Sequence, residues 1–512
     1  MATGESEVRV EDVFAYGDGH YSLPIITYHG QSLAIEDDFS RSILMGLFNA
    51  DPFNHQDIYP LDDIGTSQLF ADLFGEYVCY CPETQTWYSW EETRWVQDIG
   101  SLRVSDYMAD MVEALKFYVL ALRNADFTNE RVINYEKYVR RLFAKSRRDT
   151  AISDAERLLV SHIDRFDALP RLVNTRYGTL DLETGIVHEP EKGEWLTMST
   201  SFEYSSKALC PRWYTFLDEM TGGQEWLKDY LQKAVGYTLF GEAVEDCMFI
   251  LYGSTTRNGK STFLNAVQTM LGDYATTMPP EFICSVGSRS EWSSSEAASP
   301  ALAALRGVRM VTMSEPKAGH KLNEGLIKSL TGGEQIKARP LYGKTITFTP
   351  NFVMWMSCND LPAVTDRSLF SSHRLRVIEL NNHVPESKRD TTLRQQLCTE
   401  EAKAAIFLWA VEGYRKYRQE GLKDPEPVIQ MAKQYESDND LVWLFVQEAC
   451  VRDEDKKEKR TRLYKAFDKW CQSNGYSRNQ MSSTKFYREM ERLGFERLST
   501  NGDRYFKGVG IR

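Results

Sequence analysis

A glycine-rich stretch that ends in lysine and serine contains the residue types best suited to chemistry. In such a loop, backbone N–H groups converge on phosphate oxygens, the lysine reaches the β- and γ-phosphates of a nucleotide, and the serine hydroxyl ligates magnesium. The two glycines are one residue further apart than in the usual pattern, because Ser254 stands where the first glycine is expected. We predict a site for ATP and Mg²⁺ formed by Gly253, Ser254, Thr255, Thr256, Arg257, Asn258, Gly259, Lys260, Ser261 and Thr262.

Two polar residues further along the chain can complete this chemistry. The apolar run VRMVTMS is followed by Glu315, and the run NFVMWMSC is followed by Asn359. A carboxylate there would orient the attacking water or hold the metal, and an amide would sense the γ-phosphate or position water. The competing interpretations are an acid that only ends a strand and an asparagine that caps a turn. We predict that Lys260, Glu315 and Asn359 are catalytic and that Ser261 and Glu315 are metal ligands.

A strand and a helix must position the glycine-rich loop. Before it, the run CMFILYG is short, apolar and bounded by glycine, as a buried strand is. After it, apolar residues recur at the spacing of one helix face, at Phe263, Val267, Met270 and Leu271. This order of strand, loop and helix favours a phosphate-binding loop over the alternative, a solvated Gly-Lys-Ser turn.

The C-terminal segment is basic, whereas the whole chain has a net charge of -12. From Arg452 to Arg512 there are 16 lysines and arginines against 9 aspartates and glutamates. TRLYKAFDKWCQSNGY and SSTKFYREMERLGF are typical of helices, and the last residues alternate about Asn-Gly-Asp as a hairpin does. A basic face opposite an apolar one suits a helix in the major groove, although charge runs are often only solvated surfaces. The predicted DNA contacts here are Lys485, Arg488, Arg492, Arg504 and Lys507.

Composition limits the class of protein. The chain has 512 residues, of which 42% are hydrophobic and 26% are charged, so we expect a folded protein of about three or four domains. The acidic start has no apolar core and no apolar run is long enough to span a bilayer, so we expect neither a signal peptide nor an anchor. The nine scattered cysteines fit reduced thiols. These features predict a cytoplasmic protein.

Together the motifs resemble the superfamily 3 helicase domain of phage and plasmid primase-helicases, and more distantly the poxvirus helicase-primase. The stretches that carry the resemblance lie between about residues 205 and 400: CMFILYGSTTRNGKSTF, MSEPKAG, LNEGLIKSLTGGEQIKARPLYGKTITFTPNF, SCNDLP and SSHRLRVIEL. Weaker similarity, including the Trp-rich stretch from Tyr77 and the segment LVNTRYGTLDLETG, extends it to residues 75–512. Too few residues precede this region for a primase domain, so we expect a helicase that lacks one.

The resemblance implies a fold and a set of domains. The fold class is α/β, with an AAA+-like P-loop ATPase core of the superfamily 3 type, a mainly helical N-terminal domain and a C-terminal winged helix. The expected divisions are residues 1–74 of unknown role, 75–205 as an N-terminal α+β domain, 206–440 as the ATPase domain with flanking helices, and 452–512 as the winged helix.

The resemblance also implies how the site is completed. Family members form rings, usually hexamers, with ATP between neighbouring subunits, so the next subunit would insert an arginine. By position this residue is Arg374, and Arg376 is the second candidate. Other family members often have two consecutive arginines at this point, where this chain has His373-Arg374. The segment EQIKARPLYGKTITFTP would form a hairpin in the ring channel, unless it is only a charged, solvated hairpin. Its DNA contacts would be Lys337, Arg339, Tyr342 and Lys344.

The function implied is ATP-dependent DNA unwinding, 3′ to 5′, for replication of a phage, prophage or mobile genetic element, with origin recognition as a second role. The expected partners are single-stranded and forked DNA, origin duplex, further copies of the chain, and a separate primase or polymerase. Two alternatives remain open. One is an initiator that uses ATP only as a switch for origin binding. The other is a P-loop enzyme of another class, such as a small-molecule kinase.

Overall fold

The structure is a computed structural model, and it describes residues 26–28, 31–33, 58–126, 128–285, 300–316, 320–340, 343–364, 366–474, 481–500 and 502–512. Most of the predicted segment 1–74 therefore lies outside the described residues. The described parts of the chain form two compact units. The first comprises Met1–Asp181, Gly185–Ser199 and Arg339–Ile346, and the second comprises Leu182–Thr184, Thr200–Ala338 and Thr347–Arg512.

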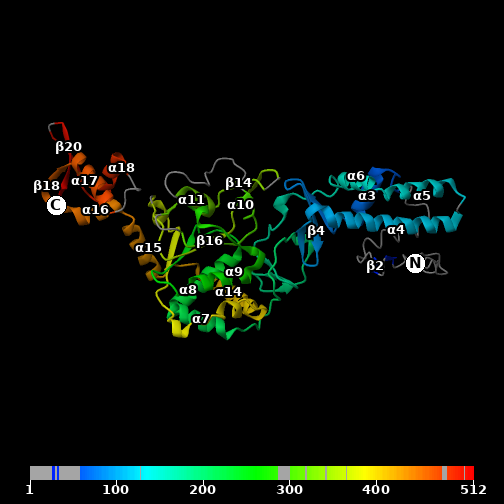
Figure 1. Cartoon of the computed structure of the whole chain (residues 1–512), viewed down its shortest axis with the longest axis horizontal. Helices are drawn as coiled ribbons and strands as arrows, with labels where there is room; N and C mark the ends of the chain where they lie inside the picture. Colours follow the sequence, from blue (N-terminus) through cyan, green and yellow to red (C-terminus); the bar gives the residue numbers. More distant parts are fainter. Residues whose placement is uncertain are drawn as a thin grey trace, which may run out of the picture. The chain divides into compact units, whose positions relative to one another are not determined.

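The first unit combines long helices with small antiparallel sheets (Figure 1). Its helices are α3 (Asp63–Phe74), α4 (Leu102–Asp126), α5 (Glu130–Leu142) and α6 (Lys145–Ala155). Its sheets are formed by β1 (Ile26–Tyr28) and β2 (Gln31–Leu33), by β3 (Val78–Cys81), β4 (Thr86–Glu91) and β5 (Arg94–Gln97), and by β6 (Leu172–Asn174), β7 (Thr179–Asp181) and β8 (Val187–His188). The side chain of Asp62 caps α3 and that of Asn129 caps α5, which fixes where both helices begin.

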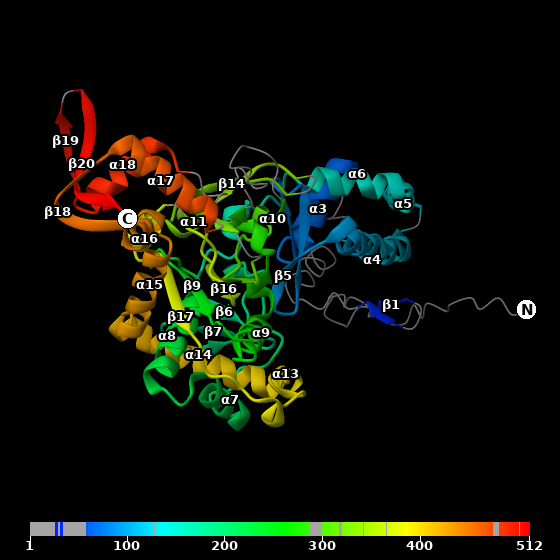
Figure 2. The ribbon, with the colours of Figure 1, turned by 60° about the vertical axis from the view of Figure 1, so that its left-hand side comes forward.

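The second unit is built on a five-stranded parallel sheet (Figure 2). The strands lie in the order β10 (Ala275–Thr277), β12 (Met310–Ser314), β16 (Val353–Cys358), β9 (Met248–Tyr252) and β17 (Leu375–Glu379). Every residue of β16 is buried, because helices cover both faces of a parallel sheet and its central strands are apolar throughout. Strand β9 lies between β16 and β17, although the next strand along the chain, β10, lies at the far edge. Such a change in strand order opens a crevice at the carboxyl ends of the strands.

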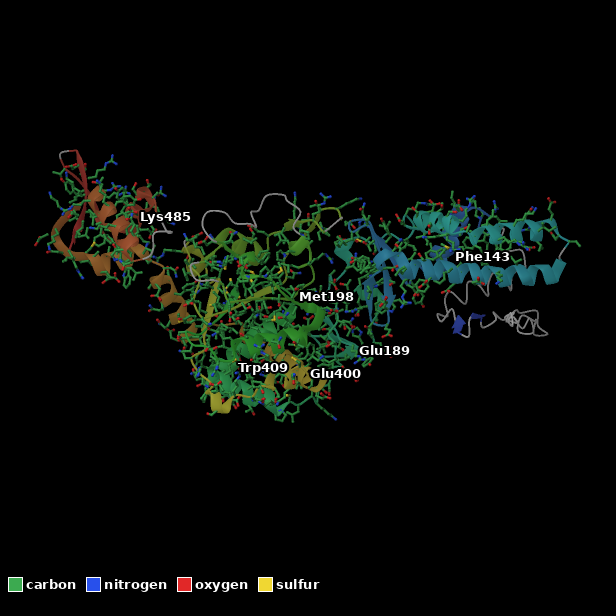
Figure 3. The ribbon with its side chains drawn as sticks, viewed as in Figure 1. Phe143, Glu189, Met198, Glu400, Trp409 and Lys485 are labelled. Carbon is green, nitrogen blue, oxygen red and sulfur yellow. The ribbon has the colours of Figure 1, made fainter. Side chains whose placement is uncertain are left out.

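The helices of this unit are α7 (Pro211–Thr221), α8 (Glu225–Phe240), α9 (Lys260–Leu271) and α14 (Glu400–Glu420). Helices α8 and α14 contact each other through two glycines. A Cβ added to Gly236 would lie 2.0 Å from the backbone nitrogen of Tyr414, and one added to Gly413 would lie 2.0 Å from the carbonyl oxygen of Gln232. Any larger residue at either position would push the helices apart. Trp409 of α14, labelled in Figure 3, is buried in the adjoining core.

Shorter elements connect the strands of this sheet. They are β11 (Cys284–Ser285), α10 (Pro300–Ala303), β13 (Lys321–Leu322), α11 (Glu324–Thr331), β14 (Ile336–Ala338), β15 (Ile346–Phe348), α12 (Ser368–Ser371) and α13 (Leu393–Gln396). Strands β14 and β15 pair with each other, and residues 341–342 between them lie outside the described residues.

A C-terminal module, residues 441–512, follows helix α15 (Glu426–Asp438). It consists of α16 (Leu441–Ala449), β18 (Cys450–Lys459), α17 (Arg460–Ser473), α18 (Ser483–Arg492), β19 (Glu496–Thr500) and β20 (Asp503–Ile511). The three strands form an antiparallel sheet with β20 in the middle (Figure 2). The module's core includes Phe445 of α16 together with Phe467 and Phe486. Helix α16 is therefore part of this core, which begins before the predicted boundary at residue 452.

None of the helices in the described part of the chain is long and apolar enough to cross a membrane.

Candidate nucleotide site and nucleic-acid surfaces

The glycine-rich loop connects the carboxyl end of β9 to the first turn of α9, as predicted. Helix α9 begins at Lys260, and its N-cap residue Gly259 has a φ of 83°, which L side chains rarely adopt. At Gly253, an added Cβ would lie 2.1 Å from Nδ2 of Asn258 and 2.6 Å from the carbonyl oxygen of Leu380. Glycine is thus required at both ends of the loop, at one end by conformation and at the other by lack of space.

The side chain of Asn258 holds the loop closed. It is buried, and its Nδ2 donates hydrogen bonds to the carbonyl oxygens of Thr255 and Leu380, each at 2.9 Å. The first bond is within the loop, and the second joins the loop to the residue that follows β17. The next segment also contacts the loop, because the backbone N–H of Val384 donates to the carbonyl oxygen of Arg257 at 3.0 Å. The loop is therefore braced before any ligand binds.

The ammonium group of Lys260 is buried among neutral acceptors. Its Nζ donates to the carbonyl oxygen of Gly253 at 3.2 Å and to the side-chain oxygens of Asn258 at 2.8 Å and Asn359 at 2.9 Å. Within the described residues, no carboxylate lies at ion-pair distance from this nitrogen. Burial lowers the pKa of Lys260, and the nearby Cys358 and Glu315 only partly oppose that effect. A buried positive charge with neutral partners is suited to binding an anion.

Glu315 and Asn359 lie at the carboxyl ends of two adjacent strands. Glu315 follows β12 and Asn359 follows β16, and the N–H of Glu315 donates to the carbonyl oxygen of Ser357 at 2.8 Å. Glu315 has a φ of 53°, an unfavourable conformation for a residue with a side chain, and such strain is often found at functional sites. The oxygen of Asn359 reaches Lys260, so the structure brings these predicted residues together.

These groups surround one pocket of about 190 Å³ at the carboxyl edge of the sheet. Its lining residues are Thr256, Arg257, Asn258, Gly259, Lys260, Ser261, Thr262, Glu315, Ser357, Cys358, Asn359 and Arg394. The donors suit a nucleotide phosphate with a magnesium ion: backbone N–H groups at the start of α9, the ammonium group, and the oxygens of Ser261 and Glu315. Gly253, Ser254 and Thr255 shape the loop from outside this lining.

Arg394 lines the pocket although the sequence patterns did not indicate it. It lies on α13, a helix of one turn, which is too short to show periodicity. The segment that leads to α13 folds along the loop, with the His383 ring bonded to the carbonyl oxygen of Thr256 and an ion pair of 3.5 Å between Arg257 and Glu386. Such contacts between distant parts of the chain bring Arg394 to the site.

The structure separates the two candidate arginine fingers. Arg374 precedes β17, at the opposite end of the sheet from the loop, and its carbonyl oxygen accepts from Met248 at the start of β9. Five strand residues at ~3.3 Å each place it about 16 Å from its own pocket. Its guanidinium donates to Oγ1 of Thr331 at 2.5 Å and to Asp246 at 3.1 Å.

Arg376 is buried within its own chain. Its guanidinium pairs with Glu245 at 3.1 Å and with Asp424 at 3.3 Å, and only 9% of its side chain is exposed. A side chain held in this way inside the unit cannot extend to a neighbouring subunit. Arg374 is also bonded within its own chain, but at 15% its side chain is somewhat more exposed than that of Arg376.

The hairpin residues predicted to contact DNA are only partly described. Lys337, Arg339 and Lys344 have exposed side chains, and Nε of Arg339 donates to the carbonyl oxygen of Gly343 at 3.0 Å, which braces the turn. Tyr342 lies outside the described residues.

In the C-terminal module, Lys485, Arg488, Arg504 and Lys507 are exposed. Figure 3 labels Lys485 on α18. Arg492, predicted on the same basic face, is also exposed, but it pairs with Asp440 and, at 2.6 Å, with Glu489. Sequence spacing alone could not show that this arginine has an acidic partner on another helix.

Asp440 joins this module to the domain that contains the five-stranded sheet. Its carboxylate accepts from Arg492, from Arg367 at 2.5 Å and from the N–H of Trp443 at 3.0 Å, where it caps α16. Arg367 immediately precedes α12, the turn that leads to Arg374. Only 7% of the Asp440 side chain is exposed. One buried carboxylate therefore bonds both the C-terminal module and the segment that leads to Arg374.

Three regions of the chain match family models. Residues 67–222 match the family described as D5 N terminal like, and residues 437–505 match the family described as Poxvirus D5 protein-like. Residues 251–374, which include the pocket loop, Glu315, Asn359 and Arg374, match a family of unknown function, DUF5906. Two of these three regions are therefore similar to D5-like proteins. The D5-like matches cover the parts that flank the pocket on both sides.

The chain has viral relatives. A protein of Acanthamoeba polyphaga mimivirus named as a putative helicase is 24% identical over 433 residues, 78% of this chain and 44% of the relative. One of Frog virus 3, named likewise, is 28% identical over 250 residues, 45% of this chain and 25% of the relative. The chain thus spans less than half the length of these relatives. Among solved structures, the apo NrS-1 C terminal region matches with 10% identity and a TM-score of 0.44, covering 85% of this chain and 96% of that one.

Proposed function

We propose that this D5-like chain is an ATP-driven DNA helicase that acts as a ring. The observation that carries the proposal is the buried ammonium of Lys260, which has only neutral partners within the described residues. It lies at the carboxyl edge of a parallel sheet, where the strand order changes and ligands of α/β proteins bind. We assign the sheet to a P-loop ATPase core of the AAA+ type and the C-terminal module to a winged helix.

The pocket residues have separate roles in hydrolysis. Lys260 and the loop N–H groups would bind the phosphates, and Ser261 with Glu315 would hold magnesium, which when bound neutralises charge on the phosphate oxygens. Glu315 would also accept a hydrogen bond from the attacking water and orient it. A bound phosphate is a stronger partner for Lys260 than the amide of Asn359. Nucleotide binding would therefore release Asn359, which is then free to contact the γ-phosphate or the water.

Arg374 completes the site of the next subunit in this proposal. It lies at the opposite end of the sheet from its own pocket, so it acts on ATP only between two copies of the chain. A hexamer is the expected ring. Lys337, Arg339, Tyr342 and Lys344 of the hairpin would contact single-stranded DNA in the channel, and movement would be 3′ to 5′. The viral relatives support a role in replicating a virus or another mobile element, with a separate primase or polymerase as partner.

The test of this function is displacement of a labelled strand from a forked duplex in the presence of ATP. Replacing Lys260 with alanine removes the charge that binds the phosphates, so we expect ATP turnover to fall ~10²- to 10³-fold and displacement to cease. Lys207→Ala is the matched control, because Lys207 is an exposed lysine outside the pocket.

The outcomes separate the rival functions. Hydrolysis by the wild-type chain that DNA barely stimulates, with no displacement, would favour an origin-binding switch. Hydrolysis by a monomer that needs no DNA would favour a P-loop enzyme of another class. Equal displacement by Lys260→Ala and wild type would overturn the assignment of the pocket.

The C-terminal module gives a second prediction. Changing Lys485 and Arg488 together to alanine should weaken binding to duplex DNA and reduce the slope of log affinity against log salt by about 2, because two phosphate contacts are lost. Arg492→Ala should instead mainly lower the melting temperature, since it leaves the buried Asp440 with one guanidinium partner fewer. Fluorescence anisotropy across a salt series and thermal unfolding measure the two effects. Equal salt slopes for the double variant and the wild type would show that α18 is not part of the DNA-binding surface.

A further inference from the structure

We infer a further nucleic-acid site, specific for single strands, on the first unit at the junction of α5 and α6. Between residues 137 and 148 the chain has six lysines and arginines and no aspartate or glutamate, although its net charge is -12. These cations are Lys137, Arg140, Arg141, Lys145, Arg147 and Arg148. We call this surface the basic junction. It is separate from the pocket, the hairpin and the C-terminal module.

The fold places these cations on the outer surface. Tyr138, Val139 and Leu142 of α5 are buried in the core of the unit, so the residues between them point outward. Five of the six cations are exposed, and Arg148 is half-buried. The charge is therefore presented to solvent on one side of α5 and on the first turn of α6.

Three of the cations are bonded to other groups of the protein. Arg140 pairs with Glu136 at 2.7 Å, and Arg147 pairs with Asp63 at 2.9 Å. Arg148 donates to the carbonyl oxygens of Leu142 at 3.2 Å and of Phe143 at 2.7 Å, which satisfies the end of α5. These bonds fix the geometry of the junction.

The other three cations have no such partner. Within the described residues, no carboxylate lies at ion-pair distance from Lys137, Arg141 or Lys145. Ala144, the N-cap residue of α6, also has no side chain that can accept from the first amides of that helix. Three unpaired charges beside the start of a helix are suited to phosphate groups on a chain, because each can displace a counterion from one phosphate.

An exposed aromatic ring lies among these charges and indicates which nucleic acid fits. Phe143 separates α5 from α6 and is 44% exposed (Figure 3). Bases of a single strand stack on aromatic side chains while lysines and arginines follow the backbone, whereas bases in a duplex are already stacked on one another. The combination therefore favours single-stranded DNA or RNA over duplex.

This inference does not depend on ATP hydrolysis, so its test omits nucleotide. The probe is a fluorescent single strand of deoxythymidines, bound to the full chain and followed by anisotropy. In the variant with Lys137→Glu, Arg141→Glu and Lys145→Glu, affinity should fall by at least about tenfold and the salt slope should decrease by about 2. Phe143→Ala should weaken binding about fivefold or more with an unchanged slope, because stacking does not involve counterions.

The matched control reverses three exposed cations outside the basic junction, with Lys207→Glu, Arg415→Glu and Lys423→Glu. It changes the net charge equally and should retain most of the affinity. A conservative variant with Lys137→Arg, Arg141→Lys and Lys145→Arg should bind as the wild type does, and melting temperatures show whether each variant folds.

Three outcomes would overturn the inference: wild-type affinity in the charge-reversed variant, an equal loss in the control, or a loss confined to a duplex probe. Failure of the proposed helicase function is a different result. Displacement and ATP turnover would then be absent in the wild-type chain, while binding of the single strand without nucleotide still responds to the basic junction.

Discussion

Replacing Arg374 with alanine is expected to leave ATP affinity near the wild-type level and to lower DNA-stimulated turnover by ~10³- to 10⁵-fold. The reason is its position: Arg374 lies at the amino end of β17, whereas the pocket lies at the carboxyl edge of the sheet. The residue cannot contribute to binding in its own chain, but it can stabilise charge on phosphate in an adjacent one. Titration with a fluorescent nucleotide measures affinity, and steady-state hydrolysis with DNA measures turnover.

Mixing two inactive variants tests whether the arginine acts between chains. A ring assembled from Lys260→Ala and Arg374→Ala subunits contains some interfaces with both residues intact, so part of the turnover should return. Arg376→Ala is the comparison, and it should destabilise the fold by about 3 kcal/mol because Glu245 and Asp424 lose their cationic partner. Full turnover in Arg374→Ala would exclude this residue from the site.

Replacing Gly253 with alanine should abolish tight nucleotide binding. The new methyl group would lie 2.1 Å from the side-chain nitrogen of Asn258 and 2.6 Å from a backbone oxygen, and the backbone cannot move without opening the loop. Overpacking of this kind costs about 1–3 kcal/mol, which corresponds to a 5- to 150-fold loss of affinity if the bound loop takes the whole strain. The dissociation constant for ATP is the quantity to measure.

Gly193→Ala provides the control for this change. An added Cβ at Gly193 meets nothing within 4 Å, so its affinity for ATP and its melting temperature should match the wild type. If Gly253→Ala binds ATP as tightly as Gly193→Ala does, the closed loop of this structure is not the conformation that binds nucleotide.

The sequence was sufficient for features that depend on neighbouring residues. The apolar runs before Gly253, Glu315 and Asn359 predict buried strands, and those strands are adjacent in one parallel sheet. Polar residues at their carboxyl ends therefore had to meet. The start of α9 at Lys260 follows from the apolar spacing after it, and Ser482 caps α18 in agreement with the predicted helix start.

Features that depend on distant parts of the chain could not be predicted. Arg394 reaches the pocket because the segment after β17 folds along the loop. No pattern of neighbouring residues in the sequence predicts the course of that segment. The sequence also does not indicate that Arg376, the second candidate for the finger, pairs with Glu245 and Asp424. Arg492 has the right spacing for a DNA-facing helix, yet its closest partners are acids of the same unit. Helical spacing identifies an outer face, but it does not reveal what lies opposite that face.

The carboxylate of Asp440 has a mechanical consequence. The chain turns between α15 and α16 at Asn439 and Asp440, and Oδ1 of Asn439 accepts from the N–H of Val364 at 2.8 Å. Both residues of this corner are thus bonded to the stretch between Asn359 and Arg374. In the proposed function, a torque that DNA exerts on the C-terminal module would therefore be transmitted to the stretch between Asn359 and Arg374.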